Sequence, residues 1–186
     1  MKRLAFLLGF VGMTVLVVSL WIPAKAIAAQ LLIAEAWEES LATGSIVKPW
    51  PWIDTWPVAR LRVPAHEVSL IALNGLSGQA LAFGPGLQWS DESLVPRGAV
   101  MIAAHNDTHF TFLEDLAPGD QVQLELPSGV LGYSVSSSRI LDVREGPLVL
   151  EQQGQLVFVT CYPFELDAVN GPLRYVVSAV QVPAAL

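Results

Sequence analysis

The chain has little of what covalent cross-linking or nucleic-acid binding would require. Its 186 residues include a single cysteine, Cys161, so no disulfide can form within the chain. From Gly44 onward 14 acidic residues stand against 7 basic ones, which disfavours a polyanionic partner such as nucleic acid. Internal repeats and low-complexity tracts are lacking as well. The 53% of hydrophobic residues suffice for one packed domain.

An uncharged apolar run, Leu4–Ile22, follows Lys2 and Arg3. As a helix its 19 residues would measure roughly 30 Å, the thickness of a bilayer's hydrocarbon core. The basic pair predicts a single-pass anchor in the cytoplasmic membrane, with the remaining chain on the extracytoplasmic or periplasmic side. A cleaved signal peptide is the alternative, because residues 24–26 (Ala-Lys-Ala) loosely fit a cleavage site. Either interpretation places the rest of the chain outside the cytoplasm. A single cysteine in an exported domain cannot form an internal disulfide, so Cys161 is expected to have another chemical role.

A short amphipathic helix is predicted over Gln30–Thr43, where good helix formers carry apolar residues on one side. Gly44 ends it, and Lys48–Trp52 follows as a stiff linker whose prolines cannot join a helix or a central strand. The tryptophans of the linker and Trp56 are interpreted as packing groups. The predicted organisation is a membrane anchor or signal segment (1–24), a helix with its linker (25–56) and a barrel domain (57–186).

After Trp56 the sequence becomes a series of short apolar or alternating runs separated by turn residues, which is typical of an all-β domain. Helices long enough for parallel crossovers are lacking, so the sequence favours a closed or nearly closed antiparallel barrel. The predicted strands are Ala59–Val63, Val68–Leu73, Ala80–Phe83, Val100–Ala104, Gln121–Leu126, Val130–Ser136, Arg139–Val143, Gln155–Cys161 and Tyr175–Val182.

Cys161 ends one of these apolar runs, Gln155–Cys161, and Tyr162-Pro163 cannot continue a central strand. This predicts that Cys161 lies at the end of a strand. The competing interpretation is a small hydrophobic residue of the core, where free cysteines are often found.

His105 follows the apolar run Val100–Ala104 in the same manner, and the segment after it is polar. A histidine at a strand end often only bonds a neighbouring carbonyl. A single cysteine with a histidine elsewhere in the chain is, however, the pattern of a thiol nucleophile and its acid/base partner. Any partnership between Cys161 and His105 has to be spatial.

Arg174 stands at the start of the last predicted strand. If that strand is antiparallel to the one ending at Cys161, its start lies beside that strand's end, and Arg174 lies next to Cys161. A guanidinium there suits a developing oxyanion or a substrate carbonyl, since it stays charged and offers several donors. A surface charge is the plainer interpretation.

Three segments resemble the signature segments of sortases, especially the single-sortase type of proteobacteria: Ala104–Phe110 (AHNDTHF), Thr160–Phe164 (TCYPF) and Leu173–Val177 (LRYVV). The likeness extends from about Gly44 to the C-terminus. Relatives commonly have Gly and Arg where this chain has Ala104 and Asn106, and the lost charge bears on substrate preference.

The resemblance implies an eight-stranded barrel and a site in which Cys161, His105 and Arg174 are catalytic. His105 is preferred over His109 because the family's histidine directly follows the strand. Asp107, His109 and Thr160 are supporting candidates, and neither cofactor nor metal is expected. The implied partners are an exported protein with a C-terminal sorting signal and an amine acceptor.

Two other functions stay open on sequence alone. One is an exported β-barrel binding module, in which Cys161 is an unreactive core residue and aromatic side chains line a groove. The other is a thiol peptidase that uses the same residues and acts only by hydrolysis. The sorting motif, the acceptor and the client protein are not legible in the sequence.

Overall fold

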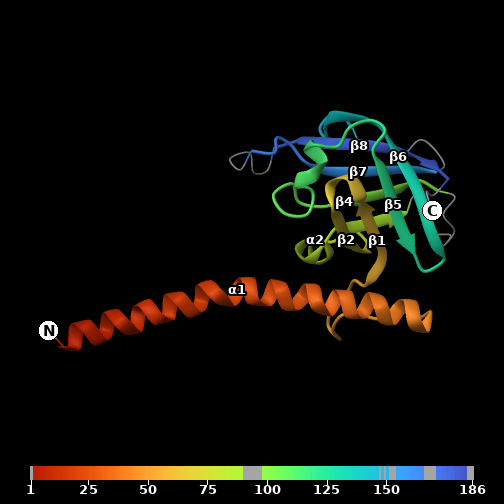
Figure 1. Ribbon diagram of the computed structural model, residues 1–186. Helices are drawn as coiled ribbons and strands as arrows, with labels where there is room; N and C mark the ends of the chain where they lie inside the picture. The colour runs from red at the N-terminus through yellow and green to blue at the C-terminus, as the bar shows by residue number, and fades with distance from the viewer. Residues whose placement is uncertain are drawn as a thin grey trace.

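Eight strands close into one barrel in the part of the chain that the computed structural model describes, residues 2–89, 98–146, 148, 150, 154–165 and 171–183 (Figure 1). The all-β, eight-stranded prediction is confirmed. Around the barrel the order is β1-β2-β3-β4-β7-β8-β6-β5. The strands are β1 (Pro57–Val63), β2 (Val68–Asn74), β3 (Gly86–Trp89), β4 (Val100–Ala103), β5 (Gln121–Leu126), β6 (Gly129–Asp142), β7 (Gln155–Cys161) and β8 (Leu173–Val182).

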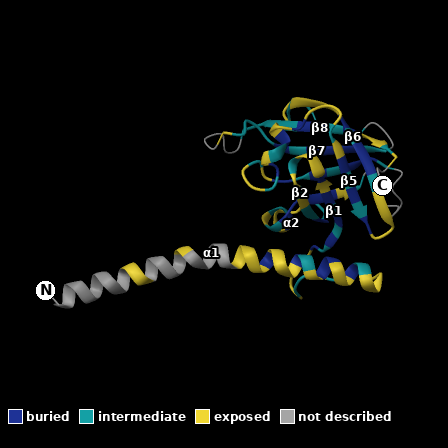
Figure 2. Cartoon of the chain, viewed as in Figure 1, coloured by how far each residue is buried: buried dark blue, intermediate teal, exposed yellow. Residues whose placement is uncertain are grey.

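The core lies inside this barrel, because alternate side chains of every strand point inward. In β1, for example, Ala59, Leu61 and Val63 are buried, whereas Arg60 and Arg62 between them are not. Figure 2 shows buried residues alternating with more exposed ones along the strands. The inner faces therefore build one continuous apolar cluster, and the outer faces are left for other contacts.

The prediction of a purely antiparallel barrel is wrong in two places. Strand β2 pairs with β3 in parallel, and β4 pairs with β7 in parallel. Parallel neighbours need a long crossover. Between β2 and β3 the crossover contains the helix α2 (Gly78–Phe83), and between β4 and β7 it consists of β5, β6 and their loops. The barrel thus obtains parallel pairs without the long helices that sequence analysis looked for.

The strand predicted at Ala80–Phe83 is instead part of α2. Ser77 caps this helix, with its Oγ accepting a hydrogen bond from the backbone N–H of Ala80 at 3.1 Å. The cap satisfies a donor that would otherwise be unpaired, so a short apolar segment becomes a helical turn. The strand missed by sequence analysis, β3, follows immediately after it.

The two strands predicted at Val130–Ser136 and Arg139–Val143 are one strand, β6. Its pairing with β8 shifts register between Val135 and Ser137, and the Ser136 hydroxyl donates to the carbonyl of Ser178 at 2.9 Å. The serines that suggested a break therefore mark an irregularity within a continuous strand. This long strand carries the chain to the end of the barrel where β8 begins.

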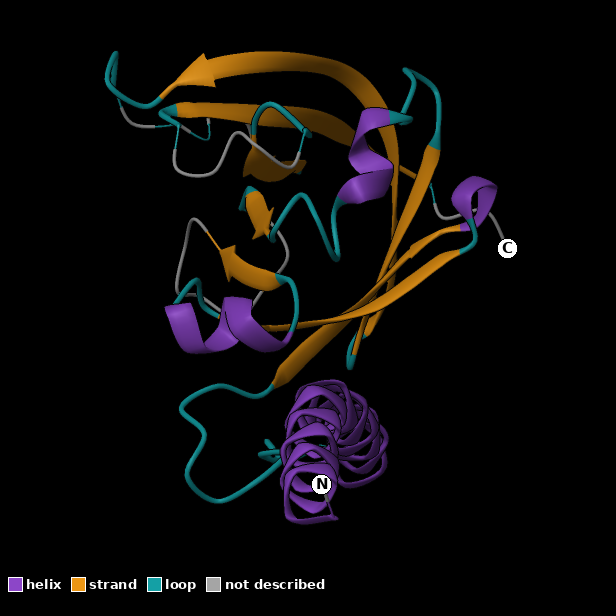
Figure 3. Ribbon diagram, turned by 90° about the vertical axis from the view of Figure 1, so that its left-hand side faces the viewer, coloured by secondary structure: helices purple, strands orange, loops and turns teal. Residues whose placement is uncertain are grey.

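The predicted amphipathic helix at Gln30–Thr43 is the C-terminal part of a longer helix, α1 (Lys2–Thr43), which runs past the predicted domain boundary at residue 24. Gly44 ends α1 as expected, with φ at 65°. Trp37 and Ile33 are buried against the barrel, and Gln30 donates to the carbonyl of Phe83. Figure 3 shows α1 almost end-on, lying outside the barrel wall.

Two short 3₁₀ turns, η1 (Pro64–His66) and η2 (Thr111–Glu114), complete the secondary structure. Within the part of the chain that the structure describes, none of the helices is long and apolar enough to cross a membrane. Most side chains of the predicted span, Leu4–Ile22, lie outside that part.

Candidate active site

Cys161 and Arg174 are direct neighbours in the sheet. Strands β7 and β8 are antiparallel, and their register places Cys161, the last residue of β7, opposite Arg174, the second residue of β8. The condition under which the sequence placed Arg174 beside Cys161, an antiparallel pairing of these two strands, is therefore met. Since paired residues in neighbouring strands point to the same face, the thiol and the guanidinium stem start from adjacent points on one surface.

His105 reaches the same level from the other side of β7. Strand β4 is parallel to β7 with Ala103 opposite Val159, and the Ala104 N–H continues the ladder by donating to the Val159 carbonyl at 3.3 Å. His105 lies two residues after Ala103, and Cys161 lies two residues after Val159. The parallel pairing that sequence analysis missed is therefore what brings this histidine beside the cysteine.

The side chains of Cys161 and Arg174 belong to the outer face of the barrel. Along β7 the buried Phe158 and Thr160 face inward, which leaves Cys161 on the outside. It is half-buried and therefore accessible, so it is not a core cysteine. Arg174 is half-buried and His105 exposed. Because adjacent strands lie about 4.8 Å apart, the His105, Cys161 and Arg174 backbones extend over about 10 Å.

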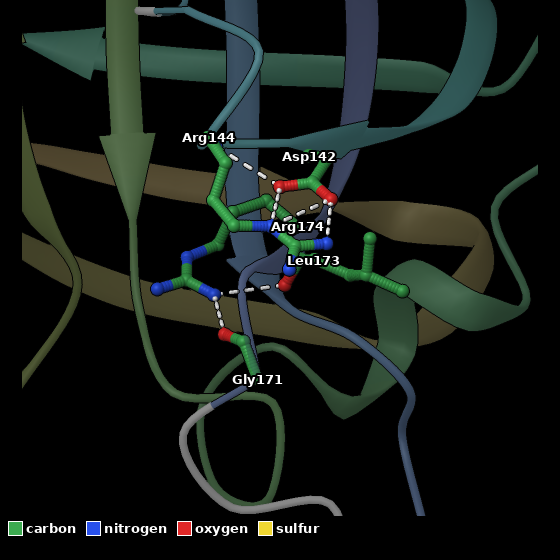
Figure 4. Close-up of polar contacts among 5 residues, drawn as sticks. All are labelled: Asp142, Arg144, Gly171, Leu173 and Arg174. Carbon is green, nitrogen blue, oxygen red and sulfur yellow. Dashed lines mark hydrogen bonds and ion pairs between the residues drawn. The ribbon is translucent and has the colours of Figure 1, made fainter.

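The guanidinium of Arg174 is held by backbone carbonyls. Its Nη1 donates to the carbonyls of Gly171 and Leu173, each at 2.8 Å (Figure 4). These bonds use one nitrogen and leave Nε and Nη2 without a described protein acceptor. Carbonyls fix the side chain without neutralising its charge, so the remaining donors can meet an anionic oxygen.

The acidic group beside this strand end is already neutralised by another arginine. Asp142 pairs with Leu173 in the sheet, and its carboxylate is bound by the guanidinium and the backbone N–H of Arg144 (Figure 4). The side-chain hydrogen bond from Arg144 is the main cause that lowers the pKa of Asp142 to about 2. Among the described residues Arg174 has no carboxylate partner of its own, so its charge is available to the site.

The loop after β4 is anchored in the core. The Phe110 N–H donates to the His105 carbonyl at 3.0 Å, and the buried Phe110 ring meets Phe158 of β7 edge-on, with centroids 5.7 Å apart. On the other side of the loop, the Asn106 amide donates to the carbonyl of Pro163 at 3.0 Å. In the sequence Asn106 stands out only as a departure from the sortase pattern, and nothing near it signals this contact.

The three supporting candidates differ in what they contact. Thr160 is buried, and its hydroxyl donates to the Ala104 carbonyl at 2.7 Å, joining the residues that precede Cys161 and His105. Asp107 is exposed. Burial, and then the charge of His105, lower the pKa of His109, whereas Asp107 opposes this shift. His109 is therefore poorly suited to hold a proton at neutral pH.

Three aromatic rings cluster at this end of the barrel, a feature that the sequence signalled only by aromatic residues following both Cys161 and Arg174. Tyr162 stacks on Tyr175 with centroids 6.2 Å apart, and Phe164 meets Tyr175 edge-on at 5.3 Å. This cluster stiffens the chain directly after Cys161. Across the described residues, no group of three His, Cys, Asp or Glu side chains could hold a metal ion.

Comparison with known proteins identifies relatives over most of this barrel. A family model described as "Sortase domain" matches residues 61–182. Sortase D of Bacillus subtilis (strain 168) is 27% identical over 124 residues, which are 66% of this chain and 62% of that protein. The match therefore covers less than two thirds of that relative's length.

Solved structures show the same fold at low identity. The Clostridium perfringens sortase D5 transpeptidase superposes with a TM-score of 0.62 at 16% identity, covering 83% of this chain and 98% of the other. Sortase A from Corynebacterium diphtheriae gives a TM-score of 0.57 at 18% identity, covering 88% of this chain and 86% of the other.

Proposed function

Because the chain belongs to the sortase family, we propose that it acts as a membrane-anchored cysteine transpeptidase. It would cleave the C-terminal sorting signal of an exported protein through a thioester on Cys161 and transfer that protein to an amine. The observation that carries this proposal is the strand register, which pairs Cys161 with Arg174 and brings His105 level with them on the other side. A nucleophile, an acid/base group and a fixed cation are thereby brought to one end of the barrel.

In the proposed mechanism, the thiolate of Cys161 attacks a backbone carbonyl of an extended peptide and forms a tetrahedral oxyanion. The free donors of Arg174 stabilise the negative oxygen. As the C–N bond breaks, His105 gives a proton to the leaving amine and a thioester remains on Cys161. An incoming amine then attacks the thioester while His105 accepts its proton, which releases the new amide and regenerates the Cys161 thiolate and the protonated His105.

The surface leading to Cys161 suits an extended apolar peptide. Ala103 and Val159 precede His105 and Cys161 by two residues, and Val176 follows Arg174 by two. The strand registers place these three residues side by side. They belong to the same outer face as Cys161 and Arg174, and Val176 is buried. An apolar floor across three strands offers contacts to alternate side chains of a bound peptide. On the three signature segments we also propose that the chain is of the proteobacterial single-sortase type.

Transfer and hydrolysis can be separated with a competing nucleophile. The client protein is sought among the products of neighbouring genes, as one that ends in a short motif, an apolar span and a basic tail. The probe is a synthetic peptide that contains this motif. With hydroxylamine present, the protein should release the acyl half mainly as hydroxamate, detected by mass spectrometry. Release of the carboxylic acid alone would instead identify a thiol peptidase. Failure of iodoacetamide to label Cys161 in the native protein would favour the binding module.

The membrane anchor is proposed from the sequence of the N-terminal run. Lys2 and Arg3 precede Leu4–Ile22, and the catalytic barrel would lie on the periplasmic side. The full chain should remain in the membrane pellet after alkaline carbonate extraction, whereas a chain beginning at Lys25 should be released. A mature protein whose N-terminal residue lies at 25–27 would show that the run is a cleaved signal peptide and overturn the anchor.

A further inference from the structure

Side-chain hydrogen bonds continue the contact between β4 and β7 beyond the end of their ladder. The last ladder pair is Ala103 with Val159, before either His105 or Cys161 is reached. Thr160 then donates to the carbonyl of Ala104 at 2.7 Å, on the buried side. Asn106 donates to the carbonyl of Pro163 at 3.0 Å, on the far side of both site residues.

These two bonds flank the site residues along the chain, one before them and one after them. Thr160 immediately precedes Cys161, and its acceptor immediately precedes His105. Asn106 immediately follows His105, and its acceptor lies two residues after Cys161. Since a carbonyl can only accept, the Asn106 amide must present its NH₂ group to Pro163. Within the described residues, this is the hydrogen bond that joins the chain after His105 to the chain after Cys161.

His105 has few other restraints on its position. It is exposed, so close packing does not hold its ring. The Phe110 N–H bond to the His105 carbonyl closes the loop onto itself, and the buried Phe110 anchors the loop's far end. Neither contact ties His105 to the segment that follows Cys161. Asn106 does so directly from the next residue, and it is half-buried.

We propose that Asn106 is a positioning residue, whose bond to the Pro163 carbonyl sets the separation between the His105 imidazole and the Cys161 thiol. This inference rests on the proposed function, because it assumes that the two groups work together. Small displacements of reacting groups are costly: about 1 Å can lower a rate by roughly 100-fold. A single amide that holds the two strand ends together would therefore affect turnover more than stability.

The test uses Asn106→Ala and the equally sized Asn106→Asp, whose carboxylate cannot donate at neutral pH. Cys161 is the only thiol, so its rate of alkylation by iodoacetamide against pH reports its ionisation midpoint. His105→Ala should shift this midpoint in the wild-type background. In both Asn106 backgrounds that shift should fall by at least half, and kcat for the peptide probe should fall about 10- to 100-fold with KM changed less than about twofold.

Gln121→Ala is the matched control, because the Gln121 amide also donates to a backbone carbonyl, that of Gly119, at 3.0 Å, but away from the site. It should leave the midpoint and kcat unchanged. Thermal unfolding and circular dichroism are to be measured for each variant, so that only folded variants are compared. If His105→Ala shifts the midpoint as strongly in the folded Asn106 variants as in the wild type, Asn106 does not position the pair. If His105→Ala shifts nothing in the wild type, the pairing of Cys161 with His105 itself is refuted, and this inference fails with it.

Discussion

Replacing Cys161 by alanine should abolish both cleavage of the peptide probe and capture of its acyl half on the protein. No other side chain of the chain is a thiol, so nothing can substitute as the sulfur nucleophile. The expected loss in kcat is at least about 10⁴-fold, as for removal of a covalent nucleophile that acts with a base. Intact-protein mass spectrometry after rapid acid quenching would reveal the acyl-enzyme in the wild type and its absence in the variant.

The same substitution should leave the fold intact. Cys161 ends β7 on the outer face and is only half-buried, outside the apolar cluster within the barrel. Removing its sulfur creates no closed cavity, so the free energy of unfolding should change by less than about 1 kcal/mol. Cys161→Ser keeps the size of the side chain and should be almost equally inactive. Appreciable turnover in a cysteine-free variant would refute the mechanism.

Replacing Arg174 by alanine should lower kcat by about 10²- to 10³-fold while KM changes much less. The guanidinium is proposed to act on the oxyanion, which exists only after attack, so its loss should appear in kcat. The Nη1 bonds to Gly171 and Leu173 hold the side chain in place before substrate binds. Stopped-flow or steady-state cleavage of the peptide probe, with kcat and KM fitted separately, measures the effect.

Two further variants show whether geometry or charge is responsible. Arg174→Lys keeps the charge but loses the fork of donors, so it should recover only part of the activity. Arg62→Ala serves as the control. Arg62 lies on β1 and forms an ion pair with Glu125 at 3.2 Å, so its removal should leave kcat at the wild-type value. Equal kcat in Arg174→Ala and the wild type would leave Arg174 as a surface charge. A rise in KM alone would assign it to substrate binding.

The candidate site was predictable from the sequence because each of its residues ends or begins an apolar run. A strand buried on its inner face must stop where polar groups appear, so His105 and Cys161 were expected at strand ends. The placement of Arg174 beside Cys161 depended on an antiparallel pairing of the last two strands, which the structure has. Asn106 was not predictable in this way, since its acceptor is a backbone carbonyl 57 residues away.

The local sequence determined most strands of the barrel, the end of α1 at Gly44 and the residue types able to perform acyl transfer, because hydrophobic alternation, turn residues and a lone thiol act through near neighbours. Tertiary structure alone decided that β4 runs parallel to β7 and that β6 is unbroken. These outcomes depend on which strands become neighbours when the sheet closes. The separation of His105 from Cys161 depends on the same closure, because no short stretch of the chain contains both.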